Sequence, residues 1–384
     1  MKISKILIPL LVCSSFITPV IAADKTQNTT QQNQQQVQQQ IVEVVFVLDT
    51  TGSMGGLLEG AKSKIWYIAN EIQNAKTNVE VRIGLIAYRD RGDDYITKHF
   101  PITSDIHSIY AELIEFQAGG GGDAPESVNQ ALYEAVQQQN WSDAHDTLRI
   151  VFLVGDAPPK MNYQDDVKYM QTVKLAKQKD IIINTILAGN SQQTKTVWQE
   201  IAQNANGSFS QIAQDGNVTI VKTPFDNEIQ HLNIELNTTV ILYGSAAVKK
   251  QASKVMESIA LAKPAASSDM ASYNSKRKIK SRVFAGDGDL LQELELKNEV
   301  LGALSDDKLP ANMQKMDDKQ RRLYIENMQQ KRSEIQTKID KLAKQRSVYM
   351  AEQIKTLSAK DKNSFDENMV SIIREQASEK GIKY

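Results

Sequence analysis

Three short runs of almost uninterrupted apolar residues constrain the fold of this sequence more than any other feature. They occupy residues 41–48 (IVEVVFVL), 148–154 (LRIVFLV) and 181–187 (IIINTIL). β-Branched runs of this kind are typical of strands whose side chains are buried on both faces, and such strands occur in parallel sheets. Segments with the spacing of amphipathic helices separate them. The sequence therefore predicts an α/β fold with a doubly wound, mostly parallel sheet.

Weaker patterns of the same kind extend the predicted domain over residues 41–244. Further strands are predicted at 79–88, 96–100 and 208–212, and helices at 57–74, 106–116, 127–138, 166–179, 194–202 and 225–243. The chain has 384 residues, which is enough for about two domains. After the α/β domain, residues 245–275 indicate a helix followed by a linker rich in Ala, Ser and Pro. Residues 276–384 indicate a helical, basic C-terminal domain.

A long helix is the main feature of this C-terminal region. Residues 317–358 contain neither Pro nor Gly and are rich in Lys, Arg, Gln and Glu. Apolar residues between Ile335 and Tyr349 fall at the spacing of a coiled coil, but Arg346 interrupts the register. The pattern favours one long packed helix over a true coiled coil, which needs several clean heptads.

The N-terminal residues have the pattern of an export signal. Lys2 and Lys5 precede an apolar stretch that ends near a small-residue cleavage site at Ala22. This predicts a signal peptide over residues 1–22, because the stretch is shorter than the ~20 apolar residues of a membrane anchor. Residues 23–40 are almost pure Gln, Asn and Thr and predict a flexible linker. We expect an exported protein, periplasmic in the first instance, with secretion or display on the outer surface as alternatives.

Composition excludes several other classes of protein. The chain carries 45 basic and 46 acidic residues, so it lacks the excess of positive charge with which proteins bind nucleic acid. No later run is long and apolar enough to span a membrane. The sequence contains no nucleophile-elbow motif and no phosphate-binding loop, and its four histidines show no metal-ligand spacing. We therefore expect no catalytic residues.

Polar side chains that follow the predicted strands form the motif that carries chemistry. Asp49, Thr51 and Ser53 come directly after the first buried strand, and Asp156 follows the second. Asp123 lies in a glycine-rich segment, GGGGDAPE. Because parallel strands end at the same edge of a sheet, these oxygen-bearing side chains should meet there. They suit a small hard cation such as Mg²⁺, and the lack of Cys and His argues against zinc or copper. Helix caps and turns are the alternative explanation.

In this order, the five residues resemble the metal-ion-dependent adhesion site (MIDAS) of von Willebrand factor type A domains. The predicted order of strands and helices over residues 41–244 resembles the same family. Many members carry Thr at the position of Asp123, and the Asp found here resembles a bacterial and kinase-associated subgroup. Its additional charge leaves Ca²⁺ and Mn²⁺ as alternatives to Mg²⁺.

The resemblance implies an exported protein-binding module that depends on a divalent cation, as in cell adhesion. An acidic side chain of the protein partner would fill the open position of the ion. Arg89, Asp90 and Glu126 would lie around the site, as further support for its ligands or as contacts to the partner. Two alternatives stay open. One is a metal-dependent hydrolase, such as a phosphoesterase, at the same Asp cluster. The other is a scaffold whose metal only stabilises the fold.

Overall fold

A computed structural model describes residues 39–122, 124–277, 285–297, 305–355 and 364–384. The predicted signal peptide, most of the predicted linker and Asp123 lie outside these ranges. Within them, no helix combines the length and the apolar character that a membrane crossing requires.

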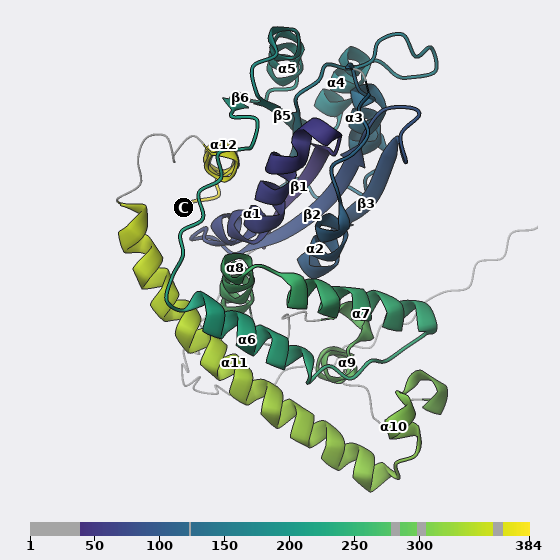
Figure 1. Ribbon diagram of the computed structural model, residues 1–384, viewed down its shortest axis with the longest axis vertical. Coiled ribbons are helices and arrows are strands. Elements are labelled where there is room, and N and C mark those ends of the chain that lie inside the picture. Colours follow the sequence, from purple (N-terminus) through teal and green to yellow (C-terminus); the bar gives the residue numbers. More distant parts are fainter. Residues whose placement is uncertain (1–38, 123, 278–284, 298–304, 356–363) are drawn as a thin grey trace, which may run out of the picture. The chain divides into compact units, whose positions relative to one another are not determined.

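Six strands form a single sheet in the order β3-β2-β1-β4-β5-β6 (Figure 1). Neighbouring strands are parallel except for β3, which runs antiparallel to β2. Their bounds are β1 Gln40–Asp49, β2 Val79–Tyr88, β3 Thr97–Thr103, β4 Leu148–Gly155, β5 Ile181–Ala188 and β6 Phe209–Ile212. The predicted α/β fold with a mostly parallel sheet is confirmed.

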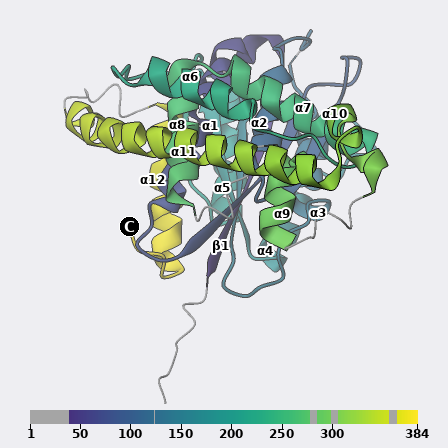
Figure 2. The same cartoon turned by 90° about the horizontal axis from the view of Figure 1, so that it is seen from below.

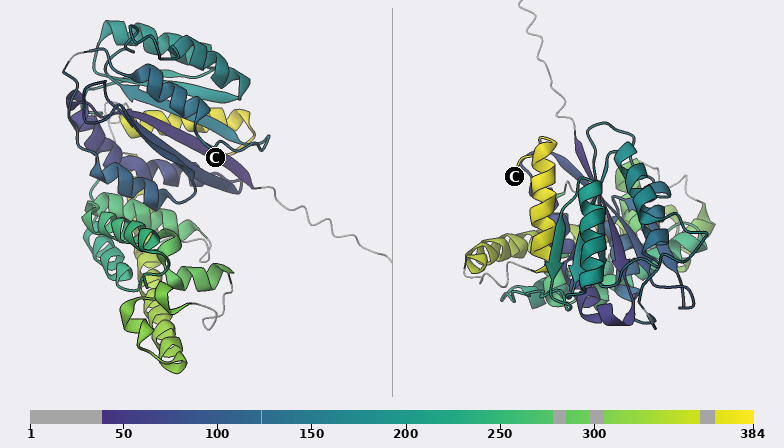
Figure 3. Two further views of the ribbon diagram at one scale, coloured as in Figure 1. Left: turned by 90° about the vertical axis from the view of Figure 1, so that its right-hand side faces the viewer. Right: turned by 90° about the horizontal axis from the view of Figure 1, so that it is seen from above.

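Burial on both faces explains the apolar runs. Along β1, Val42, Val44 and Phe46 pack into one hydrophobic core, whereas Val45 and Val47 pack into another. Successive side chains of a strand point to opposite faces, so each run needs apolar residues at nearly every position. The helices that pack on the two faces of the sheet, seen from two sides in Figure 3, are α1 Gly55–Gln73 and α2 Ile106–Glu115 on one, and α3 Val128–Gln137, α4 Tyr169–Gln178 and α5 Gln192–Asn204 on the other.

A layer of helices follows β6 in the chain. Its members are α6 Asp226–Asn237, α7 Ala246–Leu261, α8 Pro264–Lys276, α9 Leu290–Lys297, α10 Ala311–Gln314 and α11 Asp318–Ile354. The predicted long helix is α11, which packs across α6 and α8 (Figure 2). Arg346, which interrupts the coiled-coil register, lies buried between Asp226 and Asp269 and bonds each carboxylate at 2.7 Å. The interruption is thus an ion-pair centre between α11 and its neighbours.

One predicted linker is a helix instead. Residues 263–275 were expected to form a linker because of their Ala, Ser and Pro content, but α8 begins at Pro264 and most of its side chains are buried. Proline suits the first turn of a helix because that turn has no partner for its amides. The small residues let α8 pack closely against α1 and α6, so their role is packing rather than flexibility.

The last helix, α12 (Phe365–Glu379), also differs from the prediction. Phe365, Met369 and Ile373 belong to the same hydrophobic core as β1 and α1. Asn184 on β5 and Gln376 exchange two buried hydrogen bonds of 3.1 and 2.7 Å. The end of the predicted C-terminal domain therefore packs on the sheet, and helices α6–α11 are inserted between β6 and α12. An amphipathic pattern predicts a helix but not the surface that the helix covers.

Candidate functional site

The candidate site lies where the winding of the sheet changes direction. β1 and β4 are neighbours, while β2 and β5 lie on their outer sides. Ligands of open α/β sheets bind beyond the carboxyl ends of strands at such a switch point. Asp49 is the last residue of β1, and Asp156 follows directly after β4. The topology therefore brings together two residues that lie far apart in the sequence.

Alternate residues of the first turn are joined by hydrogen bonds. The amide and the hydroxyl of Thr51 donate to Asp49 Oδ1 at 2.9 and 2.7 Å, and Thr51 Oγ1 lies 3.4 Å from Ser53 Oγ. Thr51 occupies the N-cap position of the short 3-10 turn Gly52–Met54, yet among the described residues its side chain makes no capping bond. The geometry thus speaks against the helix-cap explanation for this residue.

Asp49 is fully buried, and half of its carboxylate has no partner. Its Oδ2 atom meets no hydrogen-bond donor within the described ranges. Burial, with a smaller contribution from the charge of Asp156, raises the pKa of Asp49 to about 7, although hydrogen bonds from Thr51 and from the backbone of Asp156 act to lower it. A Cβ atom on Gly155 would lie only 3.1 Å from Asp49 Oδ2. The end of β4, directly before Asp156, therefore lies beside this oxygen.

The carboxylate of Asp156 is held by a residue that the sequence prediction missed. Gln214 Nε2 donates to Asp156 Oδ2 at 2.7 Å and also approaches the carbonyl oxygen of Ser53 at 3.2 Å. The backbone oxygen of Asp156 accepts a bond from Thr194 Oγ1 at 2.9 Å. Gln214 follows β6 and so lies at the same sheet edge as the other loops. The rule that located Asp49 and Asp156 points to the turn after β6, but it does not single out Gln214 within that turn.

The glycine-rich loop packs directly on the first turn. The Gly119 amide donates to Thr50 O at 3.1 Å, and the Gly52 amide donates to Gly120 O at 3.3 Å. Gly121 has a φ of +72°, and a Cβ there would lie 2.8 Å from Thr51 Cβ. Only glycine fits this combination of backbone and space. The loop thereby ends beside the cluster, two residues before Asp123, which lies outside the described residues.

Glu126, near the same edge of the sheet, also has a buried carboxylate oxygen without a partner among the described residues. Its Oε2 atom meets no hydrogen-bond donor in the described part of the chain. Burial, together with the negative charges of Asp49, Asp90, Asp93 and Asp156, raises the pKa of Glu126 to about 8. Acidic side chains are thus crowded at this edge of the sheet, and among the described residues no cationic side chain bonds Asp49 or Glu126.

Arg89 joins the first turn to the segment before the glycine-rich loop. Its guanidinium donates to the carbonyl oxygens of Thr50 at 3.2 Å and Gln117 at 2.6 Å. Both oxygens belong to the backbone of loops that border the cluster. Arg89 is buried, so it fixes the spacing of these loops rather than standing open to a partner.

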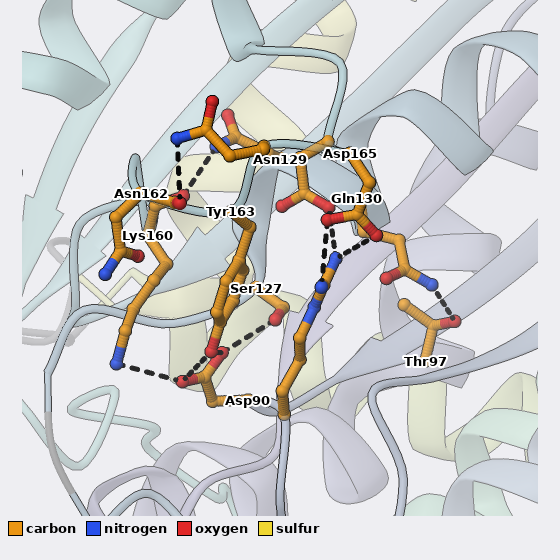
Figure 4. A network of polar contacts seen from close by, with 12 residues as sticks. Asp90, Thr97, Ser127, Asn129, Gln130, Lys160, Asn162, Tyr163 and Asp165 are labelled. Carbon is orange, nitrogen blue, oxygen red and sulfur yellow. Dashed lines mark hydrogen bonds and ion pairs between the residues drawn. The ribbon is translucent and has the colours of Figure 1, made fainter.

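Asp90 anchors the loop that follows β4, as Figure 4 shows. Its carboxylate accepts bonds from Ser127 at 2.7 Å and Tyr163 at 2.9 Å, and lies 3.3 Å from the ammonium group of Lys160. Burial acts to raise the pKa of Asp90, but these hydrogen bonds outweigh it and hold the pKa below its ordinary value. Asp90 is therefore a charged, fully engaged support of the site.

Comparison with known families identifies the sheet region. Residues 43–224 match the sequence profile of the von Willebrand factor A domain family. These residues form a von Willebrand factor A domain. The match begins within β1 and ends beyond β6, so it contains every described residue of the candidate site.

Relatives share this domain within otherwise larger proteins. An ariadne-like RING finger protein of Acanthamoeba polyphaga mimivirus is 34% identical over 33% of this chain and 12% of its own length. An alpha-protein kinase of Dictyostelium discoideum is 27% identical over 30% of this chain and 18% of its own. The human von Willebrand factor A domain-containing protein 7 is 33% identical over 30% of this chain and 12% of its own length. The matched segment spans less than a fifth of each relative.

Two solved structures are distantly similar to this chain. The protein BatB of Bacteroides thetaiotaomicron is 16% identical with a TM-score of 0.33, over 58% of this chain and 100% of that chain. Proximal thread matrix protein 1 of the mussel byssus is 13% identical with a TM-score of 0.35, over 46% of this chain and 43% of that chain. TM-scores this low say nothing about function.

The residues of the von Willebrand factor A domain fit a hard cation. Within the described ranges, no three His, Cys, Asp or Glu side chains form a metal-binding group by themselves. The set that is described consists of the carboxylates of Asp49 and Asp156 with the hydroxyls of Thr51 and Ser53. The unpartnered Asp49 Oδ2 is an oxygen that a divalent ion would satisfy.

Proposed function

We propose that this protein binds a protein partner through a divalent cation held at the switch point of its von Willebrand factor A domain. The cation is Mg²⁺ in the first instance, with Ca²⁺ and Mn²⁺ as alternatives. Asp49, Thr51, Ser53 and Asp156 would hold it, together with Asp123. When bound, the cation offers an open coordination position to an acidic side chain of the partner.

The buried and unpartnered Oδ2 atom of Asp49 carries this proposal. A carboxylate removed from water costs several kcal/mol unless a counter-charge compensates it, by order of magnitude. Among the described residues, Thr51 donates both of the hydrogen bonds that reach the other oxygen of Asp49, and the backbone of Asp156 also lowers the pKa of Asp49. Asp156 adds a second negative charge close by. A divalent ion would compensate both charges at once.

The surrounding residues support the proposal by holding the loops in place before any cation arrives. Arg89 fixes the first turn and the segment before the glycine-rich loop, and Asp90 anchors the loop that follows β4. Preorganised ligands bind a cation without a large cost in chain entropy. The hydrolase alternative would also require a nucleophile or a base that acts on a substrate, and no observation singles one out.

The site of action is proposed to be outside the cytoplasm, periplasmic in the first instance. The support for this is the sequence of residues 1–22, with its basic start, apolar stretch and small-residue end. N-terminal sequencing of the protein purified from cell fractions tests this part, since an uncleaved N-terminus in the cytoplasmic fraction would contradict it.

Thermal denaturation with each cation tests the site itself. The full chain is treated with EDTA and heated with and without MgCl₂, MnCl₂ or CaCl₂. We expect a cation to raise the melting temperature of the wild type but not of Asp49→Asn. Asp143→Asn is the matched control, because Asp143 is exposed and precedes β4, at the opposite edge of the sheet. Equal responses of all three proteins would contradict the proposal.

Capture of partners tests the function. The tagged wild type, Asp49→Asn and Asp143→Asn are crosslinked in intact cells, with and without a chelator. We expect the same crosslinked protein with the wild type and the control, and its loss with Asp49→Asn or chelator. A cation that stabilises the chain while leaving every crosslink unchanged would instead support the scaffold alternative.

A further inference from the structure

We propose that Gln214 makes this site selective for Mg²⁺ over Ca²⁺ by occupying one of the two carboxylate oxygens of Asp156. The inference rests on the proposed cation site and adds its specificity. Its basis is the 2.7 Å hydrogen bond from Gln214 Nε2 to Asp156 Oδ2. Gln214 is here a positioning residue, because it acts on the cation through Asp156.

The Gln214 side chain is held between three loops of the site. Besides Asp156, its amide nitrogen approaches Ser53 O at 3.2 Å. Its Oε1 atom occupies the space in which a Cβ on Gly189, after β5, would stand. Gly189 has a φ of +82°, a backbone conformation that favours glycine. Because glycine has no Cβ, this space is available to the Gln214 side chain. The carboxamide therefore bridges the first turn and the loops after β4 and β5.

The backbone that carries Gln214 is fixed independently of the side chain. The Phe365 amide, at the start of α12, donates to Gly216 O at 3.0 Å, and the Gly216 amide donates to Ala213 O at 2.9 Å. The Asn217 amide donates to Asp215 Oδ1 at 3.0 Å. The Gln214 side chain itself is exposed. Its removal should therefore leave the turn and the fold intact.

The coordination that remains matches a small octahedral ion. Thr51 engages Asp49 Oδ1 and Gln214 engages Asp156 Oδ2, while Asp49 Oδ2 meets no donor within the described ranges. Mg²⁺ needs six oxygens at about 2.1 Å and usually takes single carboxylate oxygens with several waters. Ca²⁺ takes about six to eight oxygens at longer distances and often uses both oxygens of a carboxylate. By engaging Oδ2, Gln214 opposes the second mode at Asp156.

Removal of the Gln214 amide should therefore shift selectivity toward Ca²⁺. The dissociation constants of Mg²⁺ and Ca²⁺ are measured by isothermal titration of the full chain, for the wild type, Gln214→Ala and Gln214→Glu. Gln211→Ala is the matched control, because Gln211 Nε2 bonds the backbone of Gly189 at 2.8 Å rather than a site carboxylate. Melting in EDTA checks that the variants stay folded.

We expect the ratio of the Ca²⁺ to the Mg²⁺ dissociation constant to fall about tenfold in Gln214→Ala, the size of effect that outer residues of metal sites exert. Gln214→Glu should shift it in the same direction, because a carboxylate cannot donate to Asp156. Gln211→Ala should leave it unchanged. A ratio within twofold of the wild type in both Gln214 variants overturns this inference alone. A wild type that binds neither cation overturns the proposed function as well.

Discussion

Replacing Asp49 with Asn should stabilise the metal-free protein at alkaline pH while abolishing its response to cations. Asn keeps the shape of Asp, and its carbonyl oxygen can still accept the two Thr51 hydrogen bonds. It carries no charge at any pH. The substitution therefore isolates the cost of burying one negative charge at the switch point of the sheet.

The magnitude follows from the pKa of Asp49. Burial raises this pKa from 3.8 to about 7 in the folded protein. Between these values the folded state keeps a proton that the unfolded state has released, so metal-free stability falls as pH rises through this window. The full shift corresponds to about 4 kcal/mol above pH 7. The Asn amide leaves a buried donor unsatisfied, at a cost of about 1–3 kcal/mol. A net gain of about 1–3 kcal/mol remains.

Urea unfolding in EDTA at pH 5 and pH 8 measures this gain. The unfolding midpoint of Asp49→Asn should exceed that of the wild type at pH 8, and the difference should shrink or reverse at pH 5. Asp143→Asn should follow the wild type at both values. With saturating Mg²⁺ at pH 8 the wild type should regain stability by mass action, and Asp49→Asn should not. An Asn variant that is less stable than the wild type by the same amount at both pH values would refute the reasoning.

Three further predictions concern other parts of the chain. Gly121→Ala should weaken cation binding at least about tenfold, since its φ of +72° and the nearness of Thr51 admit no Cβ; Gly122→Ala, with open space around it, should bind normally in the same titration. Arg346→Met should cost about 3–5 kcal/mol in urea unfolding, because it strands two buried carboxylates; a loss similar to that of an exposed Arg would contradict this. Burial lowers the pKa of His107, so stability should fall as pH drops below its ordinary value of about 6.5. His107→Gln should flatten that part of a melting-temperature profile, and an unchanged slope would count against it.

The sheet and the meeting of Asp49 with Asp156 could be predicted because local pattern and topology agree there. The apolar run of β1 requires burial on both faces, and this burial in turn requires helices on both sides. Parallel strands that end at one edge then bring Asp49 and Asp156 together without further information. Asp123 stays a prediction, since it lies outside the described residues.

The rest depends on contacts that a single sequence does not specify. The composition of α8 is shared by linkers and by closely packed helices, and only its neighbours α1 and α6 distinguish the two. The amphipathic pattern of α12 is satisfied by any apolar surface, and the sheet provides it. Gln214 is one of many glutamines, and only the turn after β6 directs its amide toward Asp156.

The treatment of buried charge distinguishes the candidate site from the rest of the described chain. In the helical layer, Asp226 and Asp269 share Arg346, and Asp289 bonds Arg332 at 2.6 Å. At the switch point, Asp49 and Glu126 each keep a buried oxygen without a donor among the described residues. The same chain thus compensates buried carboxylates where they serve packing and leaves two uncompensated where three loops converge. A free-energy cost from buried oxygens without donors is expected where residues are selected for function rather than for stability. A bound divalent cation would remove this cost.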